Sequence, residues 1–132
     1  MRLADIMSTQ VKMVGPGATL GEARTLMASA GIQHLVVVEG GLAVGVLSAR
    51  DLGGRSSTGR RASLVEDAMS PHVVGMAPGA TVRQAANRVR GRGVGCLAVM
   101  DEGRLRGIVT TTDLLELIGR GAASQQRNGR EL

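Results

Sequence analysis

The chain repeats itself after 62 positions, and this internal repeat limits its fold more than any other feature. Residues 7–52 align with residues 69–114 without a gap, and the match includes Pro-Gly-Ala-Thr at 16–19 and at 78–81. Self-similarity at a fixed spacing indicates one supersecondary unit that is used more than once. Because two copies are too few for a solenoid, the sequence predicts two subdomains that form a pseudo-twofold pair.

Each copy carries the signals of a β-α-β-β-α unit. A short apolar segment is stopped by Pro-Gly, and a capping box then opens a helix near 20–30 in the first copy and near 82–92 in the second. Gly31 and Gly93 suit the ends of these helices. Two apolar runs separated by a glycine-containing turn predict an antiparallel hairpin. The expected fold class is α+β, with the two repeats packed through their sheets.

Short lead-in helices are expected before the two copies. Leu3-Ala-Asp-Ile-Met7 resembles Val65-Glu-Asp-Ala-Met69, and a serine follows each of them. In the helix near 20–30, apolar residues recur at helical spacing, which predicts one buried face. The residues expected on that face are Leu20, Ala23, Met27 and Ala30.

The most polar part of each copy follows its last predicted strand. Ser48-Ala-Arg-Asp51 occupies this place in the first copy, and Thr110-Thr-Thr-Asp113 in the second. A hydroxyl beside a helix N-terminus favours a phosphate, and an aspartate can accept both hydroxyls of a ribose. The same spacing is close to a capping box, so the aspartates could also act only as helix caps. The residues themselves leave both functions open.

The helix after the second polar end predicts an association surface. It is expected to run from Thr111 to about Ile118, whereas Gly53 and Gly54 end the matching helix of the first copy early. Exposed apolar patches often mark interfaces, and the isologous dimer is the commonest assembly. The apolar residues of this helix are Leu114, Leu115, Leu117 and Ile118. We therefore predict a homodimer, formed by Leu115 and Ile118 with the first-copy helix near Leu52.

The net charge of +5 lies outside the repeats. Residues 53–62 carry three arginines and no acid, and residues 120–132 carry three arginines and one glutamate. Segments of this kind are usually solvated connectors, with a weak role toward nucleic acid or an acidic partner as the alternative. Four more arginines cluster near one helix, where a solvated face is favoured over a protein or nucleic-acid contact. They are Arg83, Arg88, Arg90 and Arg92.

The composition argues against several partners. Without Phe, Tyr or Trp, the chain cannot stack bases on aromatic rings, so nucleic acid is not the expected partner. No apolar stretch approaches the roughly 18–20 residues of a membrane span, and the N-terminus lacks a secretory hydrophobic region. A cytoplasmic location without membrane contact is therefore expected.

The sequence holds no arrangement of residues that is typical of catalysis. It shows no acid–base pair, nucleophile triad, metal-ligand cluster or phosphate-binding glycine loop. The single cysteine, Cys96, lies in an apolar run and fits a buried thiol. We expect a protein that is not an enzyme and requires no cofactor.

With these motifs in place, the chain resembles a tandem pair of cystathionine-β-synthase-type (CBS) domains, known as a Bateman module. The resemblance covers about residues 1–119. It rests on the two lead-ins, the two Pro-Gly-Ala-Thr helix starts, the run Gly31-Ile-Gln-His-Leu-Val-Val-Val38 and the two Gly-x-x-Ser/Thr-x-x-Asp-Leu closures. One departure is that Val36 and Ala98 stand where the family often has proline.

The expected organisation has four parts. Residues 1–54 form the first CBS repeat, and residues 55–62 form an Arg-, Ser- and Gly-rich linker. Residues 63–119 form the second repeat, and residues 120–132 form a flexible basic tail.

The resemblance implies two clefts between the repeats, in which many members bind AMP, ADP, ATP, S-adenosylmethionine or another adenosine derivative. The Ser/Thr-x-x-Asp of one repeat would hold the ribose and phosphate, and the other repeat would supply apolar walls for the base. One cleft would contain Thr110, Thr112, Asp113, Val11 and Ile32. The other would contain Ser48, Arg50, Asp51, Val73 and Val94. Lys12, Gln33, His34 and Cys96 complete the expected ligand-binding set.

His34 is the residue of this set whose function is least settled by the sequence. It lies where some relatives carry a basic residue that contacts phosphate, but a histidine in Gln-His-Leu-Val is more often a surface residue at a strand end. Its counterpart Cys96 cannot bind phosphate in that way.

The expected function is that of a stand-alone regulatory or sensor module. It would bind an adenosine-containing ligand and pass the signal to an unknown protein partner by a conformational change. Two alternatives remain: a constitutive interaction scaffold with empty clefts, and a nucleic-acid-associated protein that uses the arginine-rich linker and tail.

Overall fold

A computed structural model describes the backbone of residues 1–53 and 63–129, with side chains up to Arg120. The expected linker at 55–62 lies outside the described residues. The elements occur in the order α1 (Leu3–Ile6), β1 (Met13–Val14), α2 (Leu20–Ala30), β2 (His34–Glu39), β3 (Leu42–Ser48), η1 (Ala49–Gly53), α3 (Val65–Ala68), β4 (Gly75–Met76), α4 (Val82–Arg92), β5 (Cys96–Asp101), β6 (Arg104–Thr110) and α5 (Thr111–Gly129).

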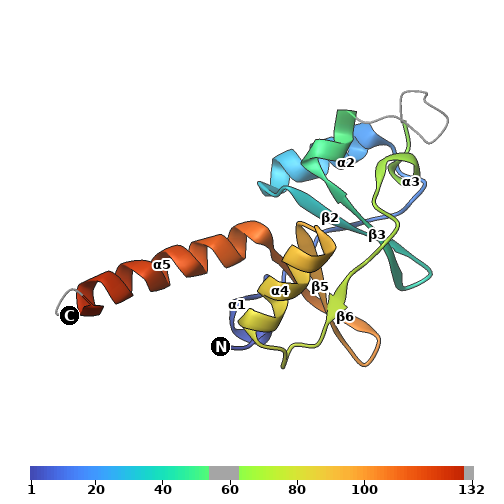
Figure 1. Cartoon of the computed structure of the whole chain (residues 1–132). Coiled ribbons are helices and arrows are strands. Elements are labelled where there is room, and N and C mark those ends of the chain that lie inside the picture. Colours follow the sequence, from blue (N-terminus) through green and yellow to red (C-terminus); the bar gives the residue numbers. More distant parts are fainter. Residues whose placement is uncertain (54–62, 130–132) are drawn as a thin grey trace.

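The two repeats have the same topology, as the 62-residue spacing predicted. Strands β1, β2 and β3 form one three-stranded sheet, and β4, β5 and β6 form the other, in chain order. In each sheet the short first strand runs parallel to the second, and the second and third strands form an antiparallel hairpin. The expected α+β class and the β-α-β-β-α unit are confirmed (Figure 1).

The capping boxes fix where α2 and α4 begin. The hydroxyl of Thr19 accepts the amide hydrogen of Glu22 at 3.0 Å, and Thr81 does the same for Gln84 at 3.1 Å. Both helices end at a glycine in the left-handed conformation, with φ of 66° at Gly31 and 64° at Gly93. Leucine, alanine and methionine of α2 are buried as expected at positions 20, 23 and 27.

Two details of the helices differ from the expectation. Ala30 is exposed because it is the last residue of α2, and Leu26 packs against the core in its place. Helix α5 does not end near Ile118 but continues to Gly129, through part of the segment that was expected to be a flexible tail. Gly119 and Gly121 each cost a helix about 1 kcal/mol, and the alanine, glutamine and arginine residues that follow favour it. In Figure 1, α5 leads away from the rest of the molecule.

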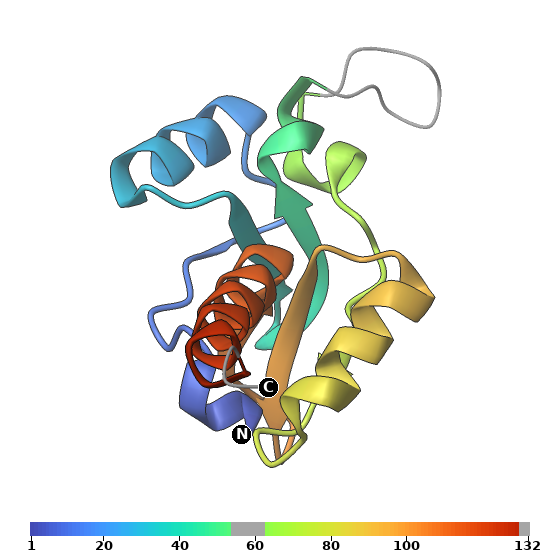
Figure 2. The same ribbon diagram turned by 60° about the vertical axis from the view of Figure 1, so that its left-hand side comes forward.

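Each lead-in helix packs on the opposite repeat. Leu3 of α1 belongs to the core cluster of the second repeat, together with Leu97, Val99 and other residues. Val65 of α3 belongs to the core cluster of the first repeat. Both side chains are fully buried. The sequence placed a lead-in before each copy, but did not indicate that the two helices cross over (Figure 2).

Backbone hydrogen bonds hold the two crossed segments. On the second repeat, Leu3 donates to Ala80 at 2.9 Å, and Ser8 and Ile108 exchange a pair of bonds at 2.9 and 3.0 Å. On the first repeat, Val65 donates to Ala18 at 2.9 Å. Val46 and Ser70 likewise exchange bonds at 3.0 and 2.9 Å, so each crossed segment adds a bridge to the outer edge of the other repeat's hairpin.

Two matched glycines make this approach possible. A Cβ at Gly107 would lie 2.7 Å from the carbonyl oxygen of Ser8 and 2.8 Å from the sulfur of Met7. A Cβ at Gly45 would lie 2.5 Å from the sulfur of Met69 and 2.7 Å from a backbone oxygen. These separations are too short for any side chain, so glycine is required at both positions by contact between the crossed segments and the hairpins.

The other face of each sheet is also buried. Val36 and Ala98 are 0% and 1% exposed, yet neither belongs to the core cluster of its own repeat. Side chains of adjacent strand residues point to opposite faces, so these two lie opposite the faces that carry the helices. This burial agrees with two repeats packed through their sheets, and an apolar side chain without proline fills the position.

The contact at Gly107 gives a testable prediction. Gly107→Ala should lower the free energy of unfolding by about 1–3 kcal/mol, because the added methyl group overlaps the Met7–Ser8 segment. Urea denaturation of the variant and the parent protein measures this change. Gly79→Ala is the matched control, since a Cβ at Gly79 meets nothing within 4 Å. Equal stabilities of the two variants would contradict the inferred crossing contact.

Candidate ligand site at the ends of β3 and β6

The polar end of the first repeat is a folded capping arrangement. Asp51 Oδ2 accepts the amide hydrogen of Ser48 at 2.7 Å and its hydroxyl hydrogen at 3.0 Å. Both residues are partly buried where β3 passes into η1. The carboxylate is therefore fixed by its own turn, and one of its two oxygens carries both bonds.

The polar end of the second repeat repeats this arrangement with one difference. Thr110 donates its amide hydrogen to Asp113 Oδ2 at 2.9 Å, and its hydroxyl accepts the amide hydrogen of Asp113 at 3.2 Å. This is the reciprocal capping box at the start of α5. Both aspartates thus serve as caps, which was one of the two functions that the sequence left open.

Capping does not use up either carboxylate. Among the described residues, the hydrogen bonds to Asp51 and Asp113 go to Oδ2. No hydrogen bond from the described part of the chain reaches the Oδ1 of either aspartate, and both residues are partly buried. A carboxylate held on one oxygen by its own turn is a prepared acceptor for a hydroxyl of a ligand.

The three hydroxyls of Thr110, Thr111 and Thr112 are not equivalent. Thr110 is engaged in the capping box, and the Thr111 hydroxyl donates to the carbonyl oxygen of Gly95 at 3.3 Å. Thr112 is exposed on the first turn of α5. The sequence pattern counted three hydroxyls beside Asp113, whereas the structure leaves Thr112 as the one without a hydrogen bond among the described residues.

His34 joins the two polar ends. It pairs with Ser48 across the β2–β3 hairpin, and its Nε2 lies 3.6 Å from the position of a Cβ at Gly95 in the second repeat. Partial burial lowers the pKa of His34 below 6.5, and the charge of Arg50 adds to this effect, whereas the charges of Asp51 and, most weakly, Asp113 oppose it. The imidazole is therefore close enough to sense carboxylates of both repeats.

Cys96 occupies the matching position in the second repeat. It pairs with Thr110 across the β5–β6 hairpin and is buried. Burial raises the pKa of this thiol to about 12, and the charge of Asp113 adds to the effect. The expected buried thiol is confirmed, and a thiol with a raised pKa stays protonated at neutral pH. The two polar ends thus differ chemically.

The remaining predicted site residues differ in their burial. Ile32 and Val94 are partly buried and pack against the core of their own repeat. Val11 and Val73 are partly buried, whereas Lys12, Gln33 and Arg50 are exposed. The carbonyl oxygen of Gln33 accepts the amide hydrogen of Ala49 at 2.8 Å. The crossed pairing of apolar walls with the opposite aspartate stays a prediction.

The ligand-binding set named from the sequence included neither Gly95 nor Thr111, although Thr111 is part of the Thr110-Thr-Thr-Asp113 pattern. Thr111 donates both its amide and its hydroxyl hydrogen to the Gly95 carbonyl, at 2.9 and 3.3 Å. Gly95 has no side chain to keep the His34 ring away. Its counterpart in the first repeat is Gln33, so the only available signal was a glycine that breaks the symmetry of the repeat.

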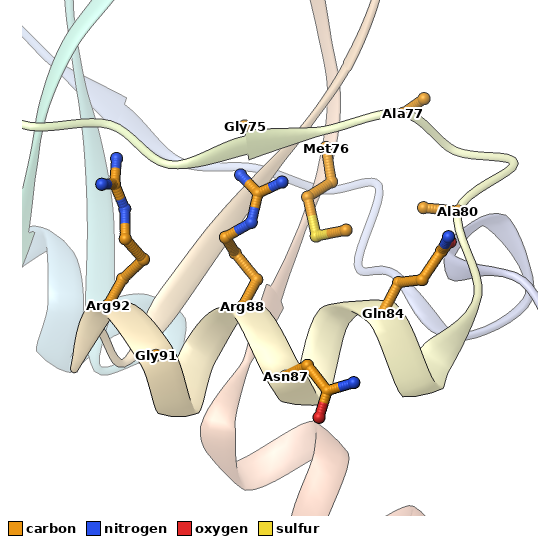
Figure 3. Close-up of a pocket in the computed structure, with 9 residues that line it drawn as sticks. All are labelled: Gly75, Met76, Ala77, Ala80, Gln84, Asn87, Arg88, Gly91 and Arg92. Atoms are coloured by element: carbon orange, nitrogen blue, oxygen red, sulfur yellow. The ribbon is translucent and has the colours of Figure 1, made fainter.

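Two open hollows on the described surface lie elsewhere. One, of about 790 Å³, lies between β4 and α4 and is lined by Met76, Arg88 and Arg92 among others (Figure 3). The other, of about 510 Å³, lies along α2. Neither hollow contains any residue of the predicted ligand site. Within the described residues, no helix could cross a membrane and no group of three His, Cys, Asp or Glu side chains could hold a metal ion.

The environment of His34 predicts a pH effect on stability. Its folded pKa is lowered, so the unfolded state binds more protons and stability is lost as the pH falls below about 6.5. His34→Gln should therefore lose less stability than the parent protein between about pH 7.5 and pH 5.5. Urea midpoints at both pH values measure the difference. The exposed His72, changed to Gln, is the control, and identical losses in all three proteins would contradict the effect.

Comparison with curated proteins identifies relatives of two kinds. The chain is 32% identical over 112 residues to the CBS domain-containing protein YhcV of Bacillus subtilis, which covers 83% of this chain and 80% of that protein. It is also 31% identical over 119 residues to a homoserine O-acetyltransferase of Methanococcoides burtonii, which covers 89% of this chain. This chain spans only 24% of the length of that acetyltransferase.

Solved structures of CBS-domain pairs share the fold. The CBS domain pair of protein MJ0100, in complex with 5′-methylthioadenosine and S-adenosyl-L-methionine, has a TM-score of 0.83 and 23% identity, over 92% of this chain and 98% of that chain. CBSX2 in complex with AMP has a TM-score of 0.77 and 21% identity, over 90% and 97% of the two chains.

The family model described as "CBS domain" matches twice, at residues 3–53 and at residues 65–120. These two ranges agree with the two repeats of the structure and leave out the intervening segment. The chain therefore belongs to the CBS-domain family and contains a tandem pair of these domains.

Proposed function

We propose that the protein is a regulatory module that binds an adenosine-containing ligand between its repeats. The observation that carries this proposal is the pair of anchored carboxylates, Asp51 and Asp113, whose hydrogen bonds to described residues all go to one oxygen, Oδ2. A ribose offers two adjacent hydroxyl donors to such a carboxylate, and the N-terminus of α5 beside Thr110 is favourable for a phosphate. AMP, ADP, ATP and S-adenosylmethionine are the ligands that we expect.

The relatives support the class of ligand. The CBS pair of MJ0100 is described with 5′-methylthioadenosine and S-adenosyl-L-methionine, and CBSX2 with AMP. Each of these molecules contains adenosine, which is the part that a ribose-binding aspartate and apolar walls would recognise. The homoserine O-acetyltransferase similarity gives no support for catalysis, because it spans a quarter of that enzyme.

Signal transfer would follow from differential affinity. A ligand that spans two repeats shifts an equilibrium between repeat arrangements by as much as its affinities for them differ. The protein partner that would read this shift is not identified by any observation on this chain. The scaffold alternative predicts the same fold without a ligand, so ligand binding decides between the two.

The proposed function predicts, first, that an adenosine ligand stabilises the folded protein. At about 100 times its dissociation constant, a ligand that binds only the folded state adds about 2.7 kcal/mol to the free energy of unfolding. Thermal unfolding with AMP, ADP, ATP, S-adenosylmethionine and NAD measures this, with guanosine monophosphate as a base control. If no adenosine compound raises the melting temperature, the scaffold function is favoured. A steeply salt-dependent binding of oligonucleotides would instead favour the nucleic-acid alternative.

The second prediction is that the two polar ends bind unequally. Asp113→Ala should weaken ligand binding more than Asp51→Ala, because α5 is long and supplies a stronger helix N-terminus than η1. Calorimetric titration of folded variants measures both. Each alanine also removes a cap, at a cost of about 0.5–2 kcal/mol in stability. Asp113→Asn and Asp51→Asn keep a capping oxygen. These variants therefore separate the effect of losing the cap on stability from the effect of losing the carboxylate on ligand affinity. A larger loss at Asp51 would reverse the assignment.

The third prediction is a homodimer through α5. Leu115 and Ile118 are 62% and 56% exposed on this helix, whereas Leu114 is buried in the second core. Leu52, which the sequence analysis added to this surface, is partly buried against the first core and is a weaker candidate. Sedimentation equilibrium should give the mass of two chains, and Leu115→Glu with Ile118→Glu should give one. The exposed Leu42→Glu is the control. A monomer mass for the parent protein would contradict the prediction.

A further inference from the structure

The hollow between β4 and α4 has a composition that the CBS repeat does not require. Its lining residues are Gly75, Met76, Ala77, Ala80, Gln84, Asn87, Arg88, Gly91 and Arg92. In Figure 3 the side chains of Arg88 and Arg92 extend from α4 toward the segment that carries β4, and Arg88 lies beside Met76. We call this hollow the α4 groove.

The same place in the first repeat is chemically different. Sixty-two positions earlier, Arg88 and Arg92 correspond to Leu26 and Ala30. Leu26 packs against the first core and also lines the hollow along α2, where an apolar side chain takes the place of the Arg88 guanidinium. Gly75 corresponds to Met13, which removes a side chain from the strand beside the groove. A hollow along this helix therefore occurs in both repeats, and the pair of arginines is what distinguishes the hollow of the second repeat.

The charge of the groove is uncompensated within the described part. Helix α4 carries four arginines and no Asp or Glu. The ion pair found among residues 1–53 and 63–120 joins Arg106 to Asp101, at 3.8 Å, and involves neither Arg88 nor Arg92. Two guanidinium groups without a carboxylate attract a ligand with at least two negative groups.

The shape of the groove suits a chain and not an enclosed small molecule. Most of its lining residues are exposed, and only Met76 and Ala80 are partly buried. An open groove would bury little of a small anion, so two surface ion pairs would hold it weakly. A longer ligand can add contacts along the groove.

Strand β4 provides such contacts. It is the edge strand of its sheet, and the Ala98 amide donates to the Val74 carbonyl at 2.9 Å. Because backbone groups alternate in direction along a strand, the N–H and C=O of Gly75 point away from β5. An extended peptide can hydrogen-bond to an exposed edge of this kind.

The spacing of the arginines matches an extended strand. Arg88 and Arg92 are four residues apart on a helix, so they are separated by about 6 Å along its axis. Side chains on one face of a strand repeat every two residues, which is about 6.6 Å. Acidic residues at alternate positions of a strand can therefore meet both arginines in turn.

We propose that the α4 groove binds an extended peptide segment of a partner protein with acidic residues at alternate positions. The segment lies along β4, its carboxylates contact Arg88 and Arg92 on the face of the sheet that Met76 lines, and its intervening side chains point to the opposite face. This site is separate from the aspartates of the ligand site, and the proposal does not depend on adenosine binding.

Fluorescence anisotropy with a synthetic peptide tests this proposal. The probe is a labelled seven-residue peptide with aspartate at alternate positions and threonine or valine between them. The full-length protein should bind it at low salt, and the affinity should fall as salt rises. The variant Arg88→Ala with Arg92→Ala should bind about tenfold more weakly. Absence of binding to the parent protein overturns the proposal.

Matched controls separate the groove from general charge. Arg83→Ala with Arg90→Ala removes two arginines from the same helix that do not line the groove, and it should change affinity by no more than about twofold. Equal losses in the two double variants overturn the proposal. A peptide of the same composition with its aspartates adjacent should bind more weakly, which tests the register. Inorganic tripolyphosphate that displaces the peptide at equal concentration would show a small-anion site instead. Saturation with AMP should leave peptide binding unchanged.

Discussion

The crossed lead-in segments hold the rest of the molecule together. Leu3 completes the core of the second repeat, and Val65 completes that of the first. Removing the Leu3 side chain would leave a cavity in the second repeat, and removing the Val65 side chain would leave one in the first. Each core includes a residue from the segment that precedes the other repeat. Neither repeat can therefore move far from its partner without breaking this packing. Close contact at Gly45 and Gly107 continues this connection from the cores to the outer edges of the hairpins.

This connection also positions the strands that carry the proposed ligand site. The strands that end at Ser48 and Thr110 are the ones whose outer edges receive the crossed segments. The capping boxes then orient Asp51 and Asp113 before any ligand arrives, which reduces the ordering that binding would require. His34 lies against Gly95 of the other repeat, whereas Cys96 is buried without an equivalent charge. A fold with near twofold symmetry thus presents two different polar ends.

The two repeats also diverge on their outer surfaces. Helix α2 carries Glu22 in its first turn and places Leu26 on the core, whereas α4 carries Gln84 and four arginines, two of which line the groove beside β4. Duplication fixes the positions that form cores, caps and glycine contacts, because their environments are the same in both copies. Exposed positions are free of that requirement, so partner-specific chemistry can develop in one copy alone.

The sequence by itself determined the repeat, the order of the elements and the starts of the helices. These depend on local signals, such as the capping boxes at Thr19 and Thr81 and the glycines at 31 and 93, which act within a few residues of one another. The pattern Ser/Thr-x-x-Asp also located the polar ends, since a capping carboxylate needs only its own turn. The sequence analysis ended α5 too early. Whether a helix continues through Gly119 depends on the helix propensities of the surrounding residues, which differ by small free energies.

Only the tertiary structure decided which repeat each lead-in helix covers. A short amphipathic helix such as Leu3–Ile6 shows that it buries one face, but not which of two similar cores receives it. Tertiary packing also decided the contact of His34 with Gly95 and the position of the groove between β4 and α4. Each depends on residues distant in the chain, and their separation in space is set by packing and not by spacing along the sequence.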